Sequence, residues 1–136
     1  MSYDPQDAIA RLMVWDVVYP LDRHTDPAKH KMWVCVSRAN LWFLRISTLK
    51  YTDQCVRLTS YKHPYLTYDS YFGAGGDLIT TPEIELEMLL GKQHDPVKQG
   101  IVGCIHTDTR AVIIDALSAS PKLTPSQLRK ILEELR

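Results

Sequence analysis

The sequence predicts a mainly β protein with a short helix near its N-terminus and two helices near its C-terminus. Two observations predict this fold class. Short segments rich in β-branched and aromatic residues follow one another through the middle of the chain, separated by Pro, Gly and polar residues. Apolar residues at helical spacing occur near the two ends. The 136 residues fit one domain, which we divide into a helix at 1–13, a β unit at 14–105 and helices at 108–136.

Composition excludes several classes of protein. With 45% hydrophobic and 24% charged residues, the chain is too apolar for wholesale disorder. The 16 Lys and Arg balance the 16 Asp and Glu, which argues against a strongly basic nucleic-acid-binding protein but leaves room for a local basic stripe. The cysteines (Cys35, Cys55 and Cys104) lack CxxC spacing and favour a reducing compartment. No apolar stretch reaches the ~20 residues of a membrane span, so we expect a cytoplasmic protein without a membrane partner.

The N-terminal elements follow from a cap and a stop signal. Asp4 is placed to cap a helix whose first residue is Pro5, and we expect this helix to end near Met13. Residues 14–19 are β-branched and aromatic and predict a strand that a proline ends. Residues 21–31 are rich in charged side chains and histidine, which predicts a long, mobile loop.

The central strands are predicted to begin with a hairpin. Residues 32–37 and 41–47 form its two strands, and the turn between them contains Asn40, which tolerates a positive φ. The first of these strands lacks alternation of polar and apolar residues, which predicts burial on both faces, as inside a small barrel. Further strands are predicted at 54–58, 65–68, 78–79 and 101–105.

The last helix has the strongest local signal in the chain. Thr124 is its cap, Pro125 its first residue, and Gln127 stands where a capping box requires it. An apolar stripe at helical spacing must dock on the sheet of this chain or on a partner chain. The stripe consists of Leu128, Ile131, Leu132 and Leu135. We expect the preceding helix to be capped by Asp108 and to end before Pro121.

The spacing of candidate ligands predicts neither a cofactor nor a metal. Residues 73–77 are rich in glycine but lack the Lys-Ser/Thr of a phosphate-binding loop, so we expect a bend there. His24 and His30 lie in the charged loop without the paired spacing of metal ligands. Four tyrosines surround Pro64, where they either cover the barrel or offer a stacking surface to bases or to a proline-rich peptide. They are Tyr61, Tyr65, Tyr68 and Tyr71.

Four short motifs follow one another in a set order. They are the Trp-Asp-Val-Val-Tyr strand at 15–19, the strand at 31–37 after a long loop, the Thr-Ser strand end at 56–60, and Asp-Ser-Tyr at 69–71. Together they resemble the PemK/MazF toxin-like family over most of residues 14–117. Trp15 stands where the family has Gly, and Lys31 and Met32 stand where it has Arg-Pro. The resemblance implies a small SH3-like barrel with terminal helices.

The resemblance also implies an activity. Many members of the family are ribonucleases that cleave single-stranded RNA without a metal. They commonly use an Arg where the loop meets the strand and a Thr at the later strand end, and by position these become Lys31 and Thr59, with Ser60 adjacent. Lysine lacks the planar fork of arginine, so Arg45 and Arg57 are the candidates to supply it from neighbouring strands.

The remaining candidate residues are expected to contact the substrate. They are His30, His63, Tyr65 and Asp69, and either histidine is a candidate acid or base.

Two hypotheses about function remain open. The first is a homodimeric, metal-independent endoribonuclease that leaves a 2′,3′-cyclic phosphate on single-stranded RNA. The second is a catalytically silent barrel of the same fold, which acts as a protein-binding or assembly module. Its partner is then an antitoxin-like peptide laid across the barrel or another copy of the chain docked by the last helix.

Overall fold

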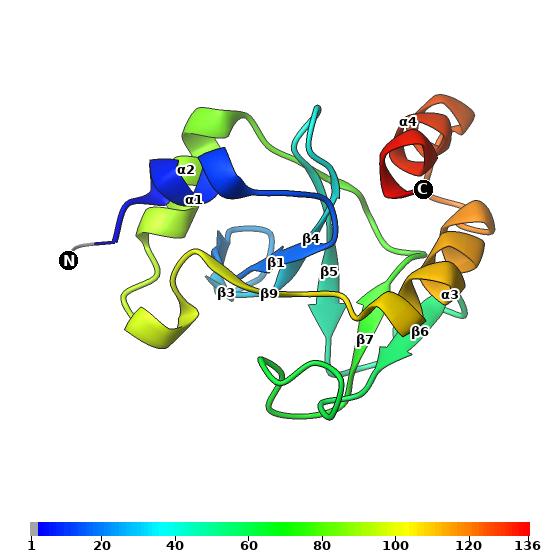
Figure 1. Cartoon of the computed structure of the whole chain (residues 1–136), viewed down its shortest axis with the longest axis horizontal. Helices are drawn as coiled ribbons and strands as arrows, with labels where there is room; N and C mark the ends of the chain where they lie inside the picture. Colours follow the sequence, from blue (N-terminus) through cyan, green and yellow to red (C-terminus); the bar gives the residue numbers. More distant parts are fainter. Residues whose placement is uncertain (1–2) are drawn as a thin grey trace.

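The computed structural model describes residues 3–136 and has a mixed α/β fold. Its centre is a seven-stranded antiparallel sheet with the order β6-β7-β5-β4-β1-β9 and with β8 paired to β5, while β2 and β3 form a separate pair (Figure 1). The strands are β1 Asp16–Val18, β2 Leu21–Asp22, β3 Lys29–His30, β4 Trp33–Ser37, β5 Trp42–Ser47, β6 Cys55–Leu58, β7 Ser70–Gly73, β8 Ile79–Thr80 and β9 Ile101–Cys104. The helices are α1 Pro5–Arg11, α2 Glu83–Gly91, α3 Thr107–Ser118 and α4 Pro125–Leu135, with a 3₁₀ turn at Pro96–Lys98.

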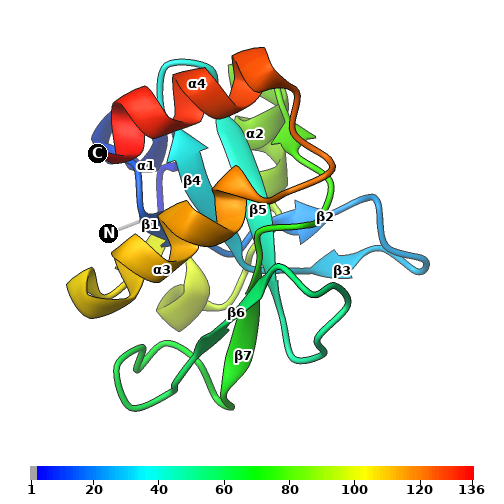
Figure 2. The ribbon, with the colours of Figure 1, turned by 90° about the vertical axis from the view of Figure 1, so that its right-hand side faces the viewer.

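Two hydrophobic cores pack against the sheet, one on each face. On one face, Trp33 and Cys35 of β4 pack with α1 and α2. On the other face, Val34 and Val36 of the same strand pack with α3 and α4, which cross the sheet together (Figure 2). The predicted burial of this strand on both faces is confirmed, because all five residues of β4 are buried. Within residues 3–136 no helix is long and apolar enough to span a membrane.

The closed barrel and the mainly β composition are wrong. Strands β6 and β9 are the two ends of the sheet, and within residues 3–136 they do not pair with each other. Helix α3 follows β9 directly and packs against β6, so a helix lies between the two edges. Helix α2 was not predicted. Its apolar residues begin with Ile84, Leu86 and Met88, an alternation with Glu that is unlike the single stripe of an amphipathic helix.

The helix caps were predicted with mixed success. Asp4 accepts a hydrogen bond from the Gln6 backbone N–H and caps α1 as expected, although the helix ends at Arg11 rather than near residue 13. The capping box of Thr124 is confirmed, and α4 docks on β4 and α3 of its own chain. The cap of α3 is His106 and not Asp108, because the imidazole accepts the backbone N–H of Asp108.

Four strand and loop predictions are corrected by backbone geometry. The strand predicted at 14–19 is shortened to β1, and Trp15, whose φ of 75° is rare in a strand, lies in the turn before it. In the turn after β4, the positive φ of 53° falls on Leu41 and not on Asn40. Residues 65–68 lie in a loop before β7 instead of forming a strand. The charged segment 21–31 is a short hairpin formed by β2 and β3 rather than a long, mobile loop.

A buried carboxylate holds the β2–β3 hairpin to the sheet. The Asp22 side chain is 0% exposed and accepts hydrogen bonds from Trp33 Nε1 at 3.0 Å, from the His24 backbone N–H at 2.9 Å and from the Arg45 guanidinium at 2.5 Å. Burial by itself raises the pKa of Asp22, but the hydrogen bonds from Arg45, His24 and Trp33 outweigh it and lower the pKa overall. A charged segment therefore folds back because one of its charges is paired inside the protein.

Replacing Asp22 by Asn is expected to destabilise the fold strongly. The substitution keeps the size of the side chain but leaves Arg45 without its counter-charge, and breaking a buried pair costs about 3 kcal/mol or more. Urea denaturation measures this loss. The matched control is Asp7→Asn, which breaks the exposed Asp7–Arg11 pair and is expected to cost less than about 1 kcal/mol. Equal losses in the two variants would contradict the role assigned to Asp22.

Candidate anion-binding pocket

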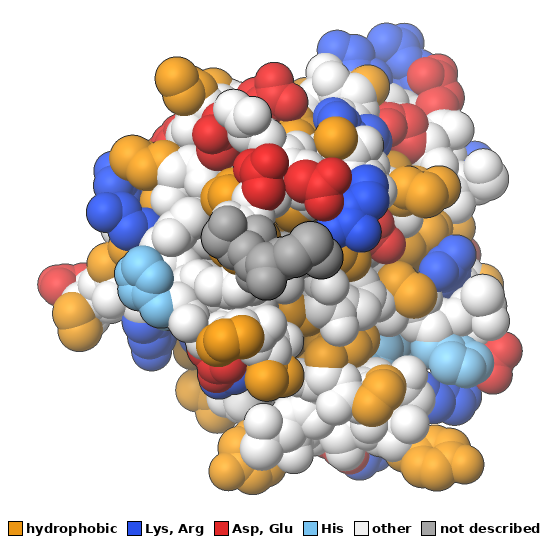
Figure 3. All heavy atoms as spheres, turned by 60° about the vertical axis from the view of Figure 1, so that its left-hand side comes forward, with side chains coloured by type: hydrophobic (Ala, Val, Ile, Leu, Met, Phe, Trp, Pro, Cys, Tyr) orange, Lys and Arg blue, Asp and Glu red, His pale blue; other side chains and the backbone are white. Residues whose placement is uncertain are grey.

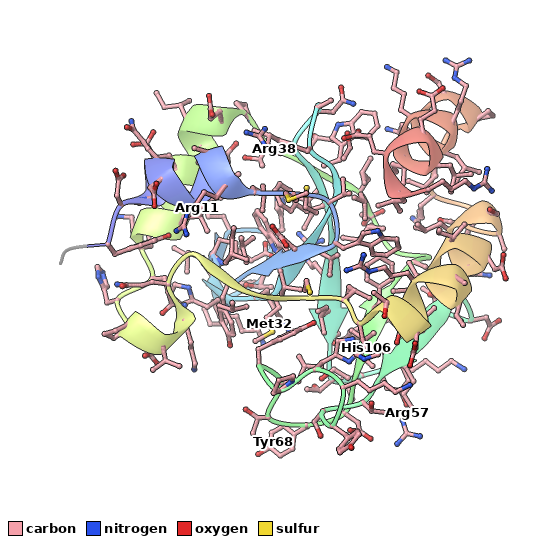
Figure 4. The ribbon with its side chains drawn as sticks, in the orientation of Figure 1. Arg11, Met32, Arg38, Arg57, Tyr68 and His106 are labelled. Carbon is pink, nitrogen blue, oxygen red and sulfur yellow. The ribbon has the colours of Figure 1, made fainter. Side chains whose placement is uncertain are left out.

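A large cavity lies beside the β2–β3 hairpin and has a volume of about 860 Å³. Its walls are residues 29–32, the end of β5, the loop 62–70 and strand β9. In Figure 4, Met32, Tyr68 and His106 all lie in this lower part of the molecule, whereas Arg57 points outward beside them. The walls come from segments far apart in the sequence, so the cavity exists only in the folded chain.

The charge of the lining is one-sided. Among the residues that the structure describes, the lining includes four lysines and two histidines and contains neither Asp nor Glu. They are Lys29, Lys31, Lys62, Lys98, His30 and His106. Acidic side chains gather elsewhere, over α1 and α2 (Figure 3), where the first helical turns contain Asp7, Glu83 and Glu85. A chain of zero net charge thus has a local basic surface.

The lysines of the pocket are only weakly neutralised. Partial burial lowers the pKa of Lys31, and the positive charges of Lys29 and Arg45 lower it further against the opposing effect of Asp22. Lys62 lies 3.6 Å from Asp108 and Lys98 lies 3.9 Å from Asp95, but all four of these side chains are largely exposed to solvent. Exposed pairs of this kind contribute at most about 1 kcal/mol. An anion entering the pocket can therefore compete for these ammonium groups.

Three tyrosines complete the lining. The Tyr65 ring lies against β9, where a Cβ on Gly103 would come within 2.3 Å of it, and the hydroxyl donates to the Cys104 carbonyl at 3.2 Å. Burial raises the pKa of Tyr65, so this hydroxyl stays protonated and keeps donating. Tyr68 is 69% exposed at the rim. Tyr19 lies under the ammonium group of Lys98, 5.3 Å from the ring centroid.

His63 joins the loop 62–70 to β9 and α3. Its side chain is fully buried, Nδ1 donates to the Thr59 carbonyl at 2.9 Å, and Nε2 accepts the backbone N–H of His106 at 3.1 Å. Because Nε2 must accept from a backbone N–H, the ring is neutral with its proton on Nδ1. Burial lowers the pKa of His63, and the positive charges of His106 and Lys62 act in the same direction against the Thr59 hydrogen bond. Both ring nitrogens are engaged inside the protein, so the site leaves His63 no contact with a substrate.

The residues carried over from the family resemblance lie in three different places. Lys31 is in the pocket lining. Arg45 binds Asp22 on another side of β5 and borders a separate cavity of about 180 Å³. Arg57 forms an exposed ion pair with Asp69 at 2.6 Å, and Asp69 also accepts the backbone N–H of Ser60 at 2.8 Å.

Thr59 lies outside the pocket lining. Its carbonyl accepts a hydrogen bond from His63, and its hydroxyl accepts one from the backbone N–H of Lys62 at 3.4 Å. Of the predicted substrate contacts, His30 and Tyr65 line the pocket, whereas Asp69 and His63 do not. The sequence reasoning missed Lys62, Lys98 and His106. Their contribution to one surface depends on tertiary structure, and no local spacing marks it.

No protein-family profile matches the chain, and neither a curated protein nor a solved structure is similar enough to count as a match. Within residues 3–136, no group of three or more His, Cys, Asp or Glu side chains is arranged to hold a metal ion.

Stability is expected to depend on pH through His63. In the unfolded chain this histidine has an ordinary pKa near 6.5, and in the folded protein its pKa is lower. Below pH 6.5 the unfolded state therefore binds more protons than the folded state, and the free energy of unfolding falls as the pH falls. The stabilisation from Asp22, whose pKa is lowered from 3.8, is lost only at more acidic pH.

Urea denaturation of the wild type and of His63→Gln between about pH 7.5 and pH 5 measures this dependence. The wild type is expected to lose stability over this range and the variant to lose less. Parallel pH profiles for the two proteins would show that the ring is not held neutral.

Proposed function

We propose that the pocket binds single-stranded RNA. The observation that supports this most directly is the composition of its lining, which brings four lysines, two histidines and three tyrosines together without a carboxylate among the described residues. Lysine ammonium groups bind phosphate oxygens, and tyrosine rings stack on unpaired bases. Both kinds of group in one cavity suit a ligand that is polyanionic and has exposed aromatic rings.

The size of the cavity favours a short single-stranded segment. A volume of about 860 Å³ lies within the range of pockets that enclose a compact ligand. Stacking on Tyr68 requires bases that are not paired, because the faces of paired bases are already stacked in a duplex. The choice of RNA follows from the resemblance to the PemK/MazF toxin-like family.

We propose binding without cleavage. Metal-independent cleavage of RNA requires a base for the 2′-hydroxyl proton, an acid for the leaving oxygen and a cation beside the phosphate. Of the expected catalytic residues, Lys31 lines the pocket, whereas Arg45, Arg57, Thr59 and Ser60 do not. Of the two candidate acid–base histidines, His30 lines the pocket and His63 does not. In the neutral form of His106, Nδ1 accepts the Asp108 N–H, which puts the proton on Nε2 and makes that nitrogen a donor rather than a base.

Kinship with the PemK/MazF toxin-like family is part of the proposal. It is supported by the order of the elements, with the Asp-Val-Val strand β1 beside the strand that follows the charged hairpin. The open, helix-bridged sheet is then a divergent form of the SH3-like barrel. A homodimer and an antitoxin-like peptide partner stay predictions.

Removing single lysines from the pocket is expected to weaken binding and to reduce its salt dependence. If Lys31 and Lys62 each neutralise one RNA phosphate, Lys31→Ala and Lys62→Ala should each reduce the slope of log K against log salt by about 0.7. Fluorescence anisotropy with a labelled single-stranded RNA of mixed sequence measures both the affinity and the slope.

Arg129→Ala is the matched control, because Arg129 is an exposed cation on α4 outside the pocket lining. It should leave the slope nearly unchanged. Equal effects of all three substitutions, or equal affinity for duplex RNA, would contradict binding in this pocket.

The wild-type protein is expected to leave RNA intact. Incubation with the same RNA in EDTA, followed by analysis of the ends, should yield no 2′,3′-cyclic phosphate. Accumulation of that product by the wild type, and its loss in Lys31→Ala, would restore the endoribonuclease hypothesis and contradict binding without cleavage.

A further inference from the structure

We propose that Gln93 is a positioning residue that makes His30 a hydrogen-bond donor toward the pocket. This inference deepens the proposed function and rests on it, because it states how His30 meets the RNA. It begins from a buried amide that joins three separate segments of the chain.

The Gln93 side chain follows α2 and is only 5% exposed. Its Nε2 lies 3.0 Å from the Tyr19 carbonyl and 3.2 Å from His30 Nδ1, and its Oε1 lies 3.2 Å from the backbone N–H of Asp95. The amide therefore touches the end of β1, the wall strand β3 and the turn before Lys98. Its backbone is also held, because Gln99 Nε2 donates to the Gln93 carbonyl at 3.0 Å.

Two of these contacts fix which way the amide faces. The Tyr19 carbonyl can only accept a hydrogen bond, and the Asp95 backbone N–H can only donate one. Turning the Gln93 amide over would set oxygen against oxygen and N–H against N–H, and buried polar groups left unpaired in this way cost about 1–3 kcal/mol each. The Nε2 amino group is therefore the atom that faces both Tyr19 and His30.

The fixed amide determines the proton on His30. Gln93 Nε2 has two hydrogens, of which one goes to the Tyr19 carbonyl and the other to His30 Nδ1. His30 Nδ1 must accept, so the neutral ring has its proton on Nε2. Nε2 has no hydrogen-bond partner within residues 3–136, and His30 lines the pocket. The ring is thus an N–H donor available to a ligand.

An N–H donor beside lysines suits a phosphate oxygen or a base carbonyl, both of which are acceptors. The same tautomer cannot take a proton at Nε2, so His30 does not act as a general base while the Gln93 contact is intact. The ring also packs on Tyr19, with centroids 6.1 Å apart, which limits its rotation. Gln93 acts through His30 and does not itself line the cavity.

The tautomer is measured directly in the free protein. Long-range ¹H–¹⁵N correlation of the histidine side chains at about pH 8, where histidine is neutral, should show His30 with an unprotonated Nδ1 and a protonated Nε2. The His30→Phe spectrum assigns the signals. In Gln93→Met, which removes the donor and keeps the length of the side chain, His30 should become a mixture of tautomers. A proton on Nδ1 in the wild type overturns the inference.

A double-mutant cycle tests whether Gln93 acts through His30. Gln93→Met should weaken RNA binding by about twofold, because in a mixture of tautomers only the rings with the proton on Nε2 can donate to the RNA, and should have no further effect in the His30→Phe background. Gln6→Met, at an exposed residue of α1, is the matched control and should leave affinity unchanged. An equal loss of affinity from Gln93→Met in both backgrounds overturns the positioning role.

The two levels of the proposal fail separately. If the wild type does not bind RNA, the proposed function is wrong. The measured tautomer of His30 then still tests whether Gln93 determines which ring nitrogen of His30 has the proton. If RNA binds but His30 has its proton on Nδ1, the pocket keeps its function and the inference about Gln93 is overturned.

Discussion

The buried carboxylate of Asp22 is the constraint on which the rest of the site depends. Residues 21–31 are too polar to fold by apolar burial, yet they form a hairpin because Asp22 accepts hydrogen bonds from Trp33, Arg45 and the chain itself. An isolated hairpin of two residues per strand is not stable in water, so pairing with the main sheet through this carboxylate determines where the hairpin lies. The hairpin in turn supplies Lys29, the ring of His30 and the start of the following segment to the pocket wall. The ion pair that anchors the hairpin therefore also positions the residues that the hairpin contributes to the pocket wall.

The opposite wall of the pocket is also held in place by a buried polar side chain, in this case the neutral ring of His63. His63 is buried and bonds through both ring nitrogens, so the loop that contributes Lys62 and Tyr65 is attached to the backbone at His106. Buried polar groups with all their hydrogen bonds satisfied make a structure rigid, and the hydrogen bonds of His63 add to the apolar contacts that Leu66 and Tyr65 make with the core. The cavity stays open, and its floor is the backbone of β9, which Gly103 leaves bare enough for a tyrosine ring to lie against it. No carboxylate is among the described residues that line the cavity, which explains how a neutral chain offers a basic surface there.

Local signals predicted the local structure, and long-range pairing decided the remainder. The caps at Asp4 and Thr124 depend on neighbouring residues alone, and the structure confirms both. The β2–β3 hairpin depends on Asp22 meeting a residue 23 positions away, which the sequence pattern does not reveal. The open form of the sheet depends on where α3 docks, which is a long-range contact. Helix α2 was not predicted because its apolar residues do not form a single stripe. At the site, His30 and Tyr65 were identified from their types and the family resemblance. The contribution of His106 was missed because histidine is not among the usual capping residues, and because its place in the wall arises from tertiary structure.

The most direct test of a basic, aromatic RNA-binding pocket is to map the contacts residue by residue. Titration of ¹⁵N-labelled protein with a short single-stranded RNA, followed by backbone amide shifts, requires no substitution and no assumption about affinity. The account predicts that the largest shifts fall at 29–32, 62–68 and 102–106, which form the cavity walls. Shifts concentrated on α4 or on the acidic helices, or an unchanged spectrum at saturating RNA, would contradict it.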